Sequence, residues 1–233
     1  MLPATAEKRA VVTAMFDRIA TRYDLVNRLM TLGLDRSWRR QAVVALGLGA
    51  GERVLDLGCG TGDLVLEVAA AGGRAVGVDL SAGMLHVAAR RGAGSAWVRG
   101  DAAALPFATR SLRAVVSGFA VRNFVDPRAV FGECARVLEP GGGLALLEVD
   151  EPRNRLLAAG HHFYFRRLVP WIGGALSDRD AYRYLPESVV YLPDEDELRA
   201  ELAAAGFEGV AKRCLSGGVA QLLTARRVAG VAS

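Results

Sequence analysis

Apolar residues recur along this chain in two alternating periods, one typical of buried strands and one typical of helices. Around 62–71, 82–91 and 127–138, apolar residues recur every three or four positions, as on one face of a helix. The apolar runs that flank these segments are short and almost continuously apolar, which is typical of strands covered on both faces. They are 53–58, 74–80, 95–100, 112–119 and 143–149. The alternation predicts a parallel sheet with helices on both faces.

The two ends of the chain extend this pattern. Residues 15–30 carry the apolar stripe of an amphipathic helix, and 194–207 reads as a helix that Gly206 ends. Two last strands are predicted near 208–214 and 218–225, and the run Glu139 to Gly143 is predicted to end a helix and begin the fifth strand. The predicted fold class is therefore α/β, a Rossmann-like doubly wound and mostly parallel sheet of seven strands.

Domain organisation follows from the same reading. With 233 residues and no repeat or low-complexity linker, the chain 1–233 is predicted to form one domain. Residues 1–48 are expected to form an N-terminal helical cover. Residues 152–193, rich in aromatic residues and arginine and without a strand pattern, are expected to form a helical insertion before the last strands.

Composition and charge limit the function classes. The excess of 29 Lys and Arg over 25 Asp and Glu is small and scattered, so no nucleic-acid partner is expected. Cys59, Cys134 and Cys214 lack metal-ligand spacing, so neither a disulfide framework nor a metal site is predicted, and a cytoplasmic protein is expected. No run approaches the roughly 18 apolar residues of a membrane span, and no signal peptide is evident.

A glycine loop follows the first predicted strand. Residues 54–64 read VLDLGCGTGDL, with Gly58, Gly60 and Gly62. In a dinucleotide fingerprint, counted from Gly58 and Gly60, the third glycine would stand where Asp63 is, and a carboxylate there would lie beside a pyrophosphate. The sequence therefore disfavours a nicotinamide dinucleotide, although that reading stays open.

Three aspartates favour another nucleoside. Asp56 precedes the first glycine, Asp79 ends the second strand and Asp101 follows the third. S-adenosylmethionine has an ammonium, a ribose diol and an adenine amino group that suit these acids in this order, and it carries no phosphate. The alternative is that each aspartate caps a helix or forms a turn.

Several motifs together resemble a known family. DLGCGTGDL, VGVDLSAGML, GDAAALPF and RVLEPGG are similar to those of class I S-adenosylmethionine-dependent methyltransferases. More narrowly, FDRIATRYDLVNRLMTLGLDRSWRR, GFAVRNFVD, YRYLPES and LSGGVAQL resemble the quinone C-methyltransferases of menaquinone and ubiquinone biosynthesis, from about residue 16 to about residue 222. Two stretches depart from the family: 148–152 reads EVDEP, where an aromatic residue and Ser-Lys-Pro usually follow the Glu, and the ending reads LLTARR.

The resemblance and the glycine loop together imply a set of cofactor contacts. Thr61, Asp79, Asp101 and Ala102 correspond to contact positions of the family, and Gly118 lies nearby. The full expected set for S-adenosylmethionine is Asp56, Gly58, Gly60, Thr61, Asp79, Leu80, Asp101, Ala102 and Gly118.

The resemblance also implies a reaction, the methylation of a ring carbon that turns demethylmenaquinol into menaquinol. Arg122 and Asn123 follow the fourth strand, at the edge of the sheet where substrates bind. Arg122 is expected to stabilise a phenolate, directly or through a water acting as the base, and Asn123 to orient an oxygen. The alternative is that Arg122 pairs with Asp126. His161, His162 and Asp150 are the other candidate bases.

The polyprenylated quinol is expected to contact aromatic and polar residues of the cover and the insertion. The predicted substrate residues are Tyr23, Asn27, Phe163, Tyr182 and Tyr184, and Trp38 and Ser188 are expected in the same cover. Residues 163–172, with Arg166 and Arg167 among aromatics, are expected either to hold the isoprenoid tail and rest on an anionic membrane or to pack on the sheet. The oligomeric state stays open, a homodimer included.

Other functions remain as alternatives. The same fold suits O- or N-methylation of another small molecule, or the benzoquinol step of ubiquinone biosynthesis. A nucleic-acid methyltransferase is disfavoured, because the fourth strand is not followed by an N/D-P-P-F/Y turn and Pro-Cys never occurs. A scaffold that has lost turnover is the remaining alternative.

Overall fold

The computed structural model describes residues 5–92, 94–152, 154, 158–160, 164, 178, 181, 184 and 187–229. The strands are β1 (Arg53–Leu57), β2 (Arg74–Asp79), β3 (Ala96–Arg99), β4 (Leu112–Gly118), β5 (Leu138–Val149), β6 (Phe207–Leu215) and β7 (Ala220–Arg227). The α-helices of the described ranges include α1 (Thr5–Met30), α2 (Leu34–Ala45), α3 (Asp63–Ala70), α4 (Ala82–Arg90), α5 (Pro127–Val137) and α9 (Glu195–Ala204). Short 3-10 helices are η1 (Val121–Asn123), η3 (Ser188–Tyr191) and η4 (Ser216–Gly218).

The seven strands form one sheet in the order β3-β2-β1-β4-β5-β7-β6. Strands β1 to β5 pair in parallel, and β7 runs antiparallel to both β5 and β6. The prediction of a mostly parallel, doubly wound sheet is confirmed. The strand order reverses between β1 and β4, and the loops at the carboxyl ends of these two strands border a crevice that suits a ligand.

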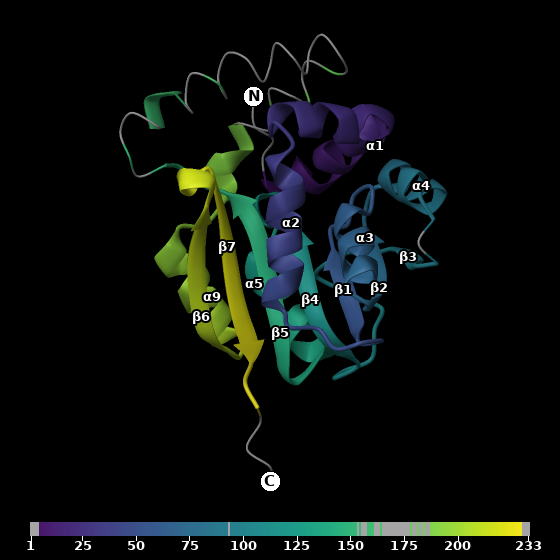
Figure 1. The fold of residues 1–233 in the computed structure, drawn as a ribbon, viewed down its shortest axis with the longest axis vertical. Coiled ribbons are helices and arrows are strands. Elements are labelled where there is room, and N and C mark those ends of the chain that lie inside the picture. Colours follow the sequence, from purple (N-terminus) through teal and green to yellow (C-terminus); the bar gives the residue numbers. More distant parts are fainter. Residues whose placement is uncertain are drawn as a thin grey trace.

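Each buried strand supplies both faces of the sheet, because successive side chains point in opposite directions. In β1, Leu55 and Leu57 pack in a core that includes residues of α5 and α9, whereas Val54 packs with residues of α2 and α3. A third cluster joins α1 to Met84 of α4. Figure 1 shows α1 lying across the upper end of the sheet, where the carboxyl ends of β4 and β5 point. The N-terminal helix therefore covers the edge at which the site is expected.

The structure corrects some predicted bounds. Helix α1 begins at Thr5, ten residues before the apolar stripe that predicted it. Strand β5 begins at Leu138 instead of 143, because the Pro-Gly segment stays in the sheet as an irregularity: Leu112 pairs with Leu138, and Ala114 already pairs with Gly143. Gly206 does end α9, with a φ of 92°. Most of the predicted insertion 152–193 lies outside the described residues.

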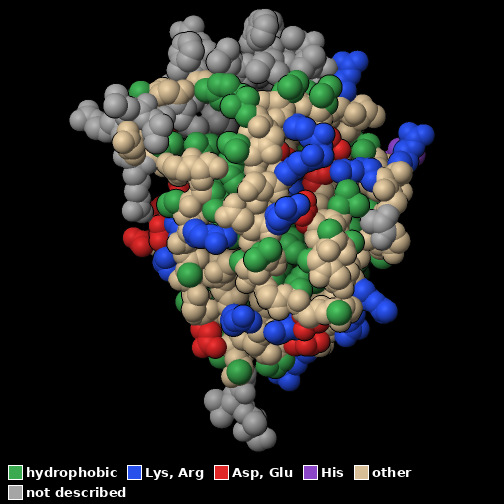
Figure 2. Space-filling view, viewed as in Figure 1, with side chains coloured by type: hydrophobic (Ala, Val, Ile, Leu, Met, Phe, Trp, Pro, Cys, Tyr) green, Lys and Arg blue, Asp and Glu red, His purple; other side chains and the backbone are tan. Residues whose placement is uncertain are grey.

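Within the described ranges, no helix combines the length and the apolar character that crossing a bilayer requires. Figure 2 shows basic and acidic side chains intermingled over the middle of one face, and hydrophobic side chains gathered near its upper end. The exposed large apolar residues include Leu25, Leu29, Leu32 and Leu34, around the end of α1 and the start of α2.

Candidate functional site

A cavity of about 440 Å³ opens at the carboxyl ends of β1, β2, β3 and β4. Seven of the nine predicted cofactor residues line it, namely Gly58, Gly60, Asp79, Leu80, Asp101, Ala102 and Gly118. Arg9, Phe16 and Tyr23 of α1 line its other side, and Asn123 of η1 lines its end. The fold thus brings together strand ends that are up to 60 residues apart along the chain, because parallel strands finish at one edge.

The glycine loop keeps the backbone close to this cavity. Gly58 and Gly60 adopt positive φ angles of 68° and 53°, which other residues adopt at a cost. A Cβ at Gly58 would lie 2.7 Å from the Cβ of Ala120, so a side chain there would push the β4 loop away. At Gly60 the space around a Cβ is open. Gly58 therefore serves packing of the loop, and Gly60 leaves the backbone open to a ligand.

Of the three acids that line the cavity, Asp79 and Asp101 are predicted cofactor residues, and Asp126 caps α5. Asp79 accepts hydrogen bonds from the backbone N–H of Gly60 at 2.8 Å and of Ser81 at 2.8 Å. Burial raises the pKa of Asp79 above its ordinary value, and these donors oppose the rise. Asp101 accepts from the N–H of Ala103 and pairs with Arg9 of α1 at 2.8 Å. Each carboxylate is held in place by the chain and keeps lone pairs that a ligand hydroxyl or amino group can use.

Asp56 and Thr61 are the two predicted cofactor residues that do not line the cavity. The Thr61 hydroxyl donates to Asp24 of α1. Asp56 is 1% exposed, and neither of its carboxylate oxygens has a hydrogen-bond partner in the part of the chain that the structure describes. Burial raises the pKa of Asp56 to about 8, and the charge of Arg39 opposes this. Burial of Asp56 therefore favours its protonated form.

This buried acid makes stability depend on pH. An unfolded carboxyl has its ordinary pKa of 3.8, so between that value and about 8 the folded state holds a proton that the unfolded state has lost. The free energy of unfolding consequently falls as pH rises through this window, by at most about 1.4 kcal/mol per pH unit from this group. We expect Asp56→Asn to flatten the fall, measured by urea unfolding at about pH 5 and about pH 8. Equal slopes in the two proteins would contradict the assignment.

A second cavity, of about 360 Å³, adjoins the first, because Tyr23 and Phe119 line both. The predicted substrate residue Asn27 lines it, together with Trp38 and Tyr164. Arg122 is the only charged side chain among its described lining residues. Phe163 and Tyr182, the other predicted substrate residues beside Tyr184, lie outside the described residues. The described part of the second cavity is thus mostly apolar, with a few neutral polar side chains and one cation.

Arg122 does not pair with Asp126, so that alternative is wrong. Asp126 caps α5 by accepting from the N–H of Ala129. Arg122 instead donates from Nη1 to Glu148 Oε2 at 2.6 Å and from Nε to the hydroxyl of Ser188 at 3.1 Å. The reason lies in topology: β4 and β5 are neighbours, with Gly118 opposite Leu147, so Glu148 lies beside the segment that follows β4.

Side chains from other elements hold Asn123 and the backbone of η1 in place. Tyr184 donates its hydroxyl to Asn123 Oδ1 at 3.2 Å, and burial raises the pKa of Tyr184 to about 12. Lys8 of α1 donates to the carbonyl oxygens of Arg122 at 2.9 Å and Phe124 at 3.0 Å. Burial lowers the pKa of Lys8. Tyr184 therefore contacts a residue of the first cavity, Asn123, and lines neither of the two cavities itself.

The other candidate bases are not supported. Asp150 forms an ion pair with Lys212 at 2.9 Å, and Lys212 also contacts Glu195. His161 and His162 lie outside the described residues. No group of three metal-ligating side chains occurs in the described part of the chain. The predicted catalytic residues lie one in each cavity: Asn123 lines the first and Arg122 the second.

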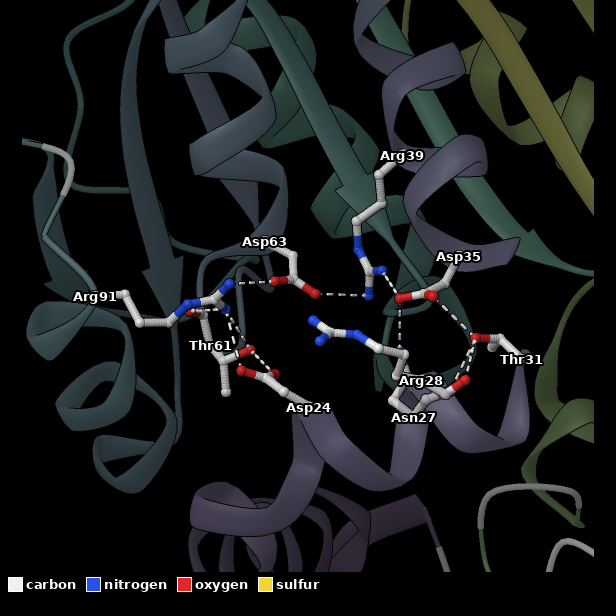
Figure 3. A network of polar contacts seen from close by, with 9 residues as sticks. All are labelled: Asp24, Asn27, Arg28, Thr31, Asp35, Arg39, Thr61, Asp63 and Arg91. Atoms are coloured by element: carbon white, nitrogen blue, oxygen red, sulfur yellow. Dashed lines mark hydrogen bonds and ion pairs between the residues drawn. The ribbon is translucent and has the colours of Figure 1, made fainter. Parts of the chain in front are cut away.

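A network of polar contacts ties the N-terminal helices to the glycine loop (Figure 3). Asp24 of α1 binds Thr61 and Arg91, and Arg91 also pairs with Asp63 at 2.7 Å. Asp63 lies between Arg91 and Arg39 of α2, whose guanidinium also pairs with Asp35. Asp63, which stands where a dinucleotide fingerprint has its third glycine, is thus part of the link between the N-terminal helices and the glycine loop.

The sequence did not predict the contacts that three residues make with Arg122. Lys8, Glu148 and Ser188 are 114, 26 and 66 positions from Arg122. Ser188 was expected only as part of the cover. One signal was available for Glu148, since a charged residue inside a buried apolar strand needs a partner.

The comparisons with known proteins agree with the geometry. The family model described as the ubiE/COQ5 methyltransferase family matches residues 4–227. A demethylmenaquinone methyltransferase of Mycolicibacterium paratuberculosis is 43% identical over 217 residues, which cover 93% of this chain and 94% of that protein. The ubiquinone/menaquinone biosynthesis C-methyltransferase UbiE of Geobacter sulfurreducens is 40% identical over 230 residues, covering 95% and 90%.

Solved structures share the fold at lower identity. The [4+2]-cyclase SpnF superposes with a TM-score of 0.65 at 20% identity, covering 98% of both chains. Phosphoethanolamine N-methyltransferase 2 of Haemonchus contortus, in complex with S-adenosyl-L-methionine, has a TM-score of 0.60 at 17% identity, covering 81% of this chain and 52% of that one. These likenesses establish the fold, and the activity must be argued from the site and the family. On the match over residues 4–227 and the identity to curated relatives, this chain belongs to the ubiE/COQ5 methyltransferase family.

Proposed function

We propose that this protein transfers the methyl group of S-adenosylmethionine to a ring carbon of a polyprenylated naphthohydroquinone, converting demethylmenaquinol to menaquinol. The observation that carries the proposal is the pair of cavities that meet at Tyr23 and Phe119. One is lined by the glycine loop and by Asp79, Asp101 and Asp126, and in the other Arg122 is the one charged side chain among the described lining residues. The names of the relatives from Mycolicibacterium paratuberculosis and Geobacter sulfurreducens support this choice of reaction.

The first cavity fits a nucleoside without phosphates. Asp79 would accept from the ribose hydroxyls, and Asp101 from the adenine amino group, since both carboxylates face the cavity with lone pairs left. A phosphate would meet repulsion from Asp79 and Asp101, whereas a sulfonium would not. The nucleoside supplies an electrophilic methyl group on sulfur.

Methyl transfer also requires a nucleophilic ring carbon, which the second cavity can help to generate. Ionising a phenol with a pKa of about 10 at neutral pH costs roughly 4 kcal/mol. Arg122 reduces this cost, because its guanidinium lines the cavity and can donate to the forming phenolate, directly or through a water. The hydroxyl loses a proton, the negative charge spreads to the adjacent ring carbon, and the new carbon–carbon bond forms as the methyl–sulfur bond breaks. Asn123, held by Tyr184, orients an oxygen from its place in the first cavity.

The rim of the second cavity supports contact with a membrane. Leu32 and Leu34 line this cavity and are 76% and 42% exposed. Leu25 and Leu29 of α1 are also exposed nearby in the sequence, and arginines 22, 28 and 36 flank these leucines along the chain. Leucines that enter the acyl boundary beside arginines that bind anionic head groups would let the isoprenoid tail pass from lipid to cavity.

The test supplies demethylmenaquinol in vesicles with isotopically labelled S-adenosylmethionine, and mass spectrometry locates the label in the product. We expect the label on a ring carbon, and faster turnover on vesicles with anionic lipid than on zwitterionic ones at equal substrate density. Label on oxygen would identify an O-methyltransferase, and no label at all with the cofactor bound would contradict the substrate class. Equal rates on both vesicles would remove only the membrane contact.

A further inference from the structure

Arg122 is not a free cation in its cavity. Its side chain and that of Glu148 are 6% and 2% exposed, and their ion pair of 2.6 Å is buried at the ends of β4 and β5. Ser188 of η3 accepts from Nε on the other side. Of the five N–H donors of a guanidinium, these contacts use two. Among the described residues, no hydrogen bond or ion pair uses Nη2, so this end of Arg122 is available to a substrate oxygen.

The carboxylate of Glu148 is only partly hydrogen-bonded. Its Oε2 accepts from Arg122 and from the backbone N–H of Val149, whereas its buried Oε1 has no partner among the described residues. A buried carboxylate oxygen without a partner costs free energy, and such groups in native proteins often have a functional reason. A hydrophobic pair of similar size would have avoided this cost.

Among the described groups around the Arg122 guanidinium, Glu148 is the one that acts on it as an anion. Tyr23 of α1 and Tyr184 also lie near the guanidinium, and burial raises the pKa of each, so both are neutral at physiological pH. The Lys8 amine on the Arg122 carbonyl adds positive charge. Ser188 is neutral. Glu148 is consequently the one anion, among the described residues, in contact with the Arg122 side chain.

We propose that Glu148 is a positioning residue, which orients the guanidinium of Arg122 and limits the positive charge that it presents to the substrate hydroxyl. This inference rests on the proposed quinol substrate. The limitation has a purpose: a phenolate that is bound too strongly by a full cation is a weaker carbon nucleophile, whereas a partly neutralised guanidinium still donates hydrogen bonds. Glu148 thus balances ionisation of the hydroxyl against reactivity of the ring carbon.

The test compares kcat as a function of pH for the wild type, Glu148→Gln and Ser188→Ala. Glutamine keeps an acceptor for Nη1 and removes the negative charge. With no anion beside it, Arg122 stabilises the phenolate more, so the acid limb of the profile shifts to lower pH by about one unit. The plateau at high pH falls, because the phenolate is less nucleophilic. Ser188→Ala removes a neutral contact with the same guanidinium, so it lowers kcat without moving the limb.

Glu148→Asp keeps the charge and shortens the side chain, so it is expected to lower kcat while its limb stays at the wild-type pH. Thermal melting and calorimetry with S-adenosylmethionine check that each variant folds and that the first cavity is intact. If Glu148→Gln does not fold, Glu148→Asp decides, and a shifted limb there overturns the inference. In a folded Glu148→Gln, an unmoved limb or a shift to higher pH also overturns it. Failure of the wild type to methylate the quinol would instead contradict the proposed function.

Discussion

Replacing Arg122 by alanine is expected to lower kcat for quinol methylation by about two to three orders of magnitude, the range seen when one charge-stabilising donor is removed from an active site. The physical reason is that Arg122 is the only charged group among the described residues that line the second cavity. Without it, this mostly apolar cavity has no donor of comparable strength for a phenolate. The measurement is initial rate under saturating S-adenosylmethionine and substrate.

The alanine variant leaves Glu148 buried without a cation, which destabilises a protein by several kcal/mol. Arg122→Lys therefore accompanies it: lysine keeps a cation for Glu148 but gives up the planar fork that also reaches Ser188. We expect Arg122→Lys to fold and to lose at least about tenfold in kcat. Arg128→Ala, on the exposed side of α5, is the matched control with wild-type turnover. Turnover within a fewfold of wild type in Arg122→Ala would remove the phenolate role.

The second large effect is expected at Asp79. Replacing it by asparagine should weaken binding of S-adenosylmethionine roughly hundredfold, because two hydroxyl contacts to a carboxylate contribute about 3 kcal/mol. The variant also puts an amide NH₂ opposite the N–H of either Gly60 or Ser81, both of which donate to the native carboxylate. The glycine loop therefore loses one of its fixed points. Isothermal calorimetry measures the dissociation constant directly.

The control for this variant is Asp194→Asn, which changes an acid that caps α9 and does not line either cavity. Its affinity for S-adenosylmethionine should equal that of the wild type. An Asp79→Asn protein that binds the nucleoside as tightly as wild type would show that Asp79 only braces the loop. In that case the two backbone hydrogen bonds would be its whole function.

The cofactor half of the site was predictable because its signals are local. A glycine loop after a strand and an aspartate at the end of a strand each indicate a ligand site without reference to distant segments. The reason is that parallel strands end at a common edge. Seven of the nine expected residues line the cavity for this reason. Asp56 and Thr61 do not, because Asp56 is buried on the face of β1 that α2 and α3 cover, and the Thr61 hydroxyl contacts Asp24 of α1.

The substrate half was less predictable, since its contacts join distant segments. Arg122 and Asn123 were correctly expected near the sheet edge, but the expected rival partner Asp126 is occupied in capping α5. Neither the role of Lys8 on the η1 backbone nor that of Glu148 on the guanidinium follows from spacing. Asp150, a candidate base, directly follows β5 and is held by Lys212 of β6, a strand that pairs with β7 and not with β5.

The class of fold, the family and the edge of the sheet expected to hold the nucleoside could be predicted from residue patterns, because periodicity, turn residues and strand ends are properties of short segments. Which charges meet depends on how those segments pack. Whether Arg122 is free, paired with Asp126 or paired with Glu148 depends on which strand lies beside β4, and whether Asp56 carries a charge depends on how completely the sheet and α3 exclude water from it. Distances between side chains and access to solvent are set by packing, and no local pattern encodes them.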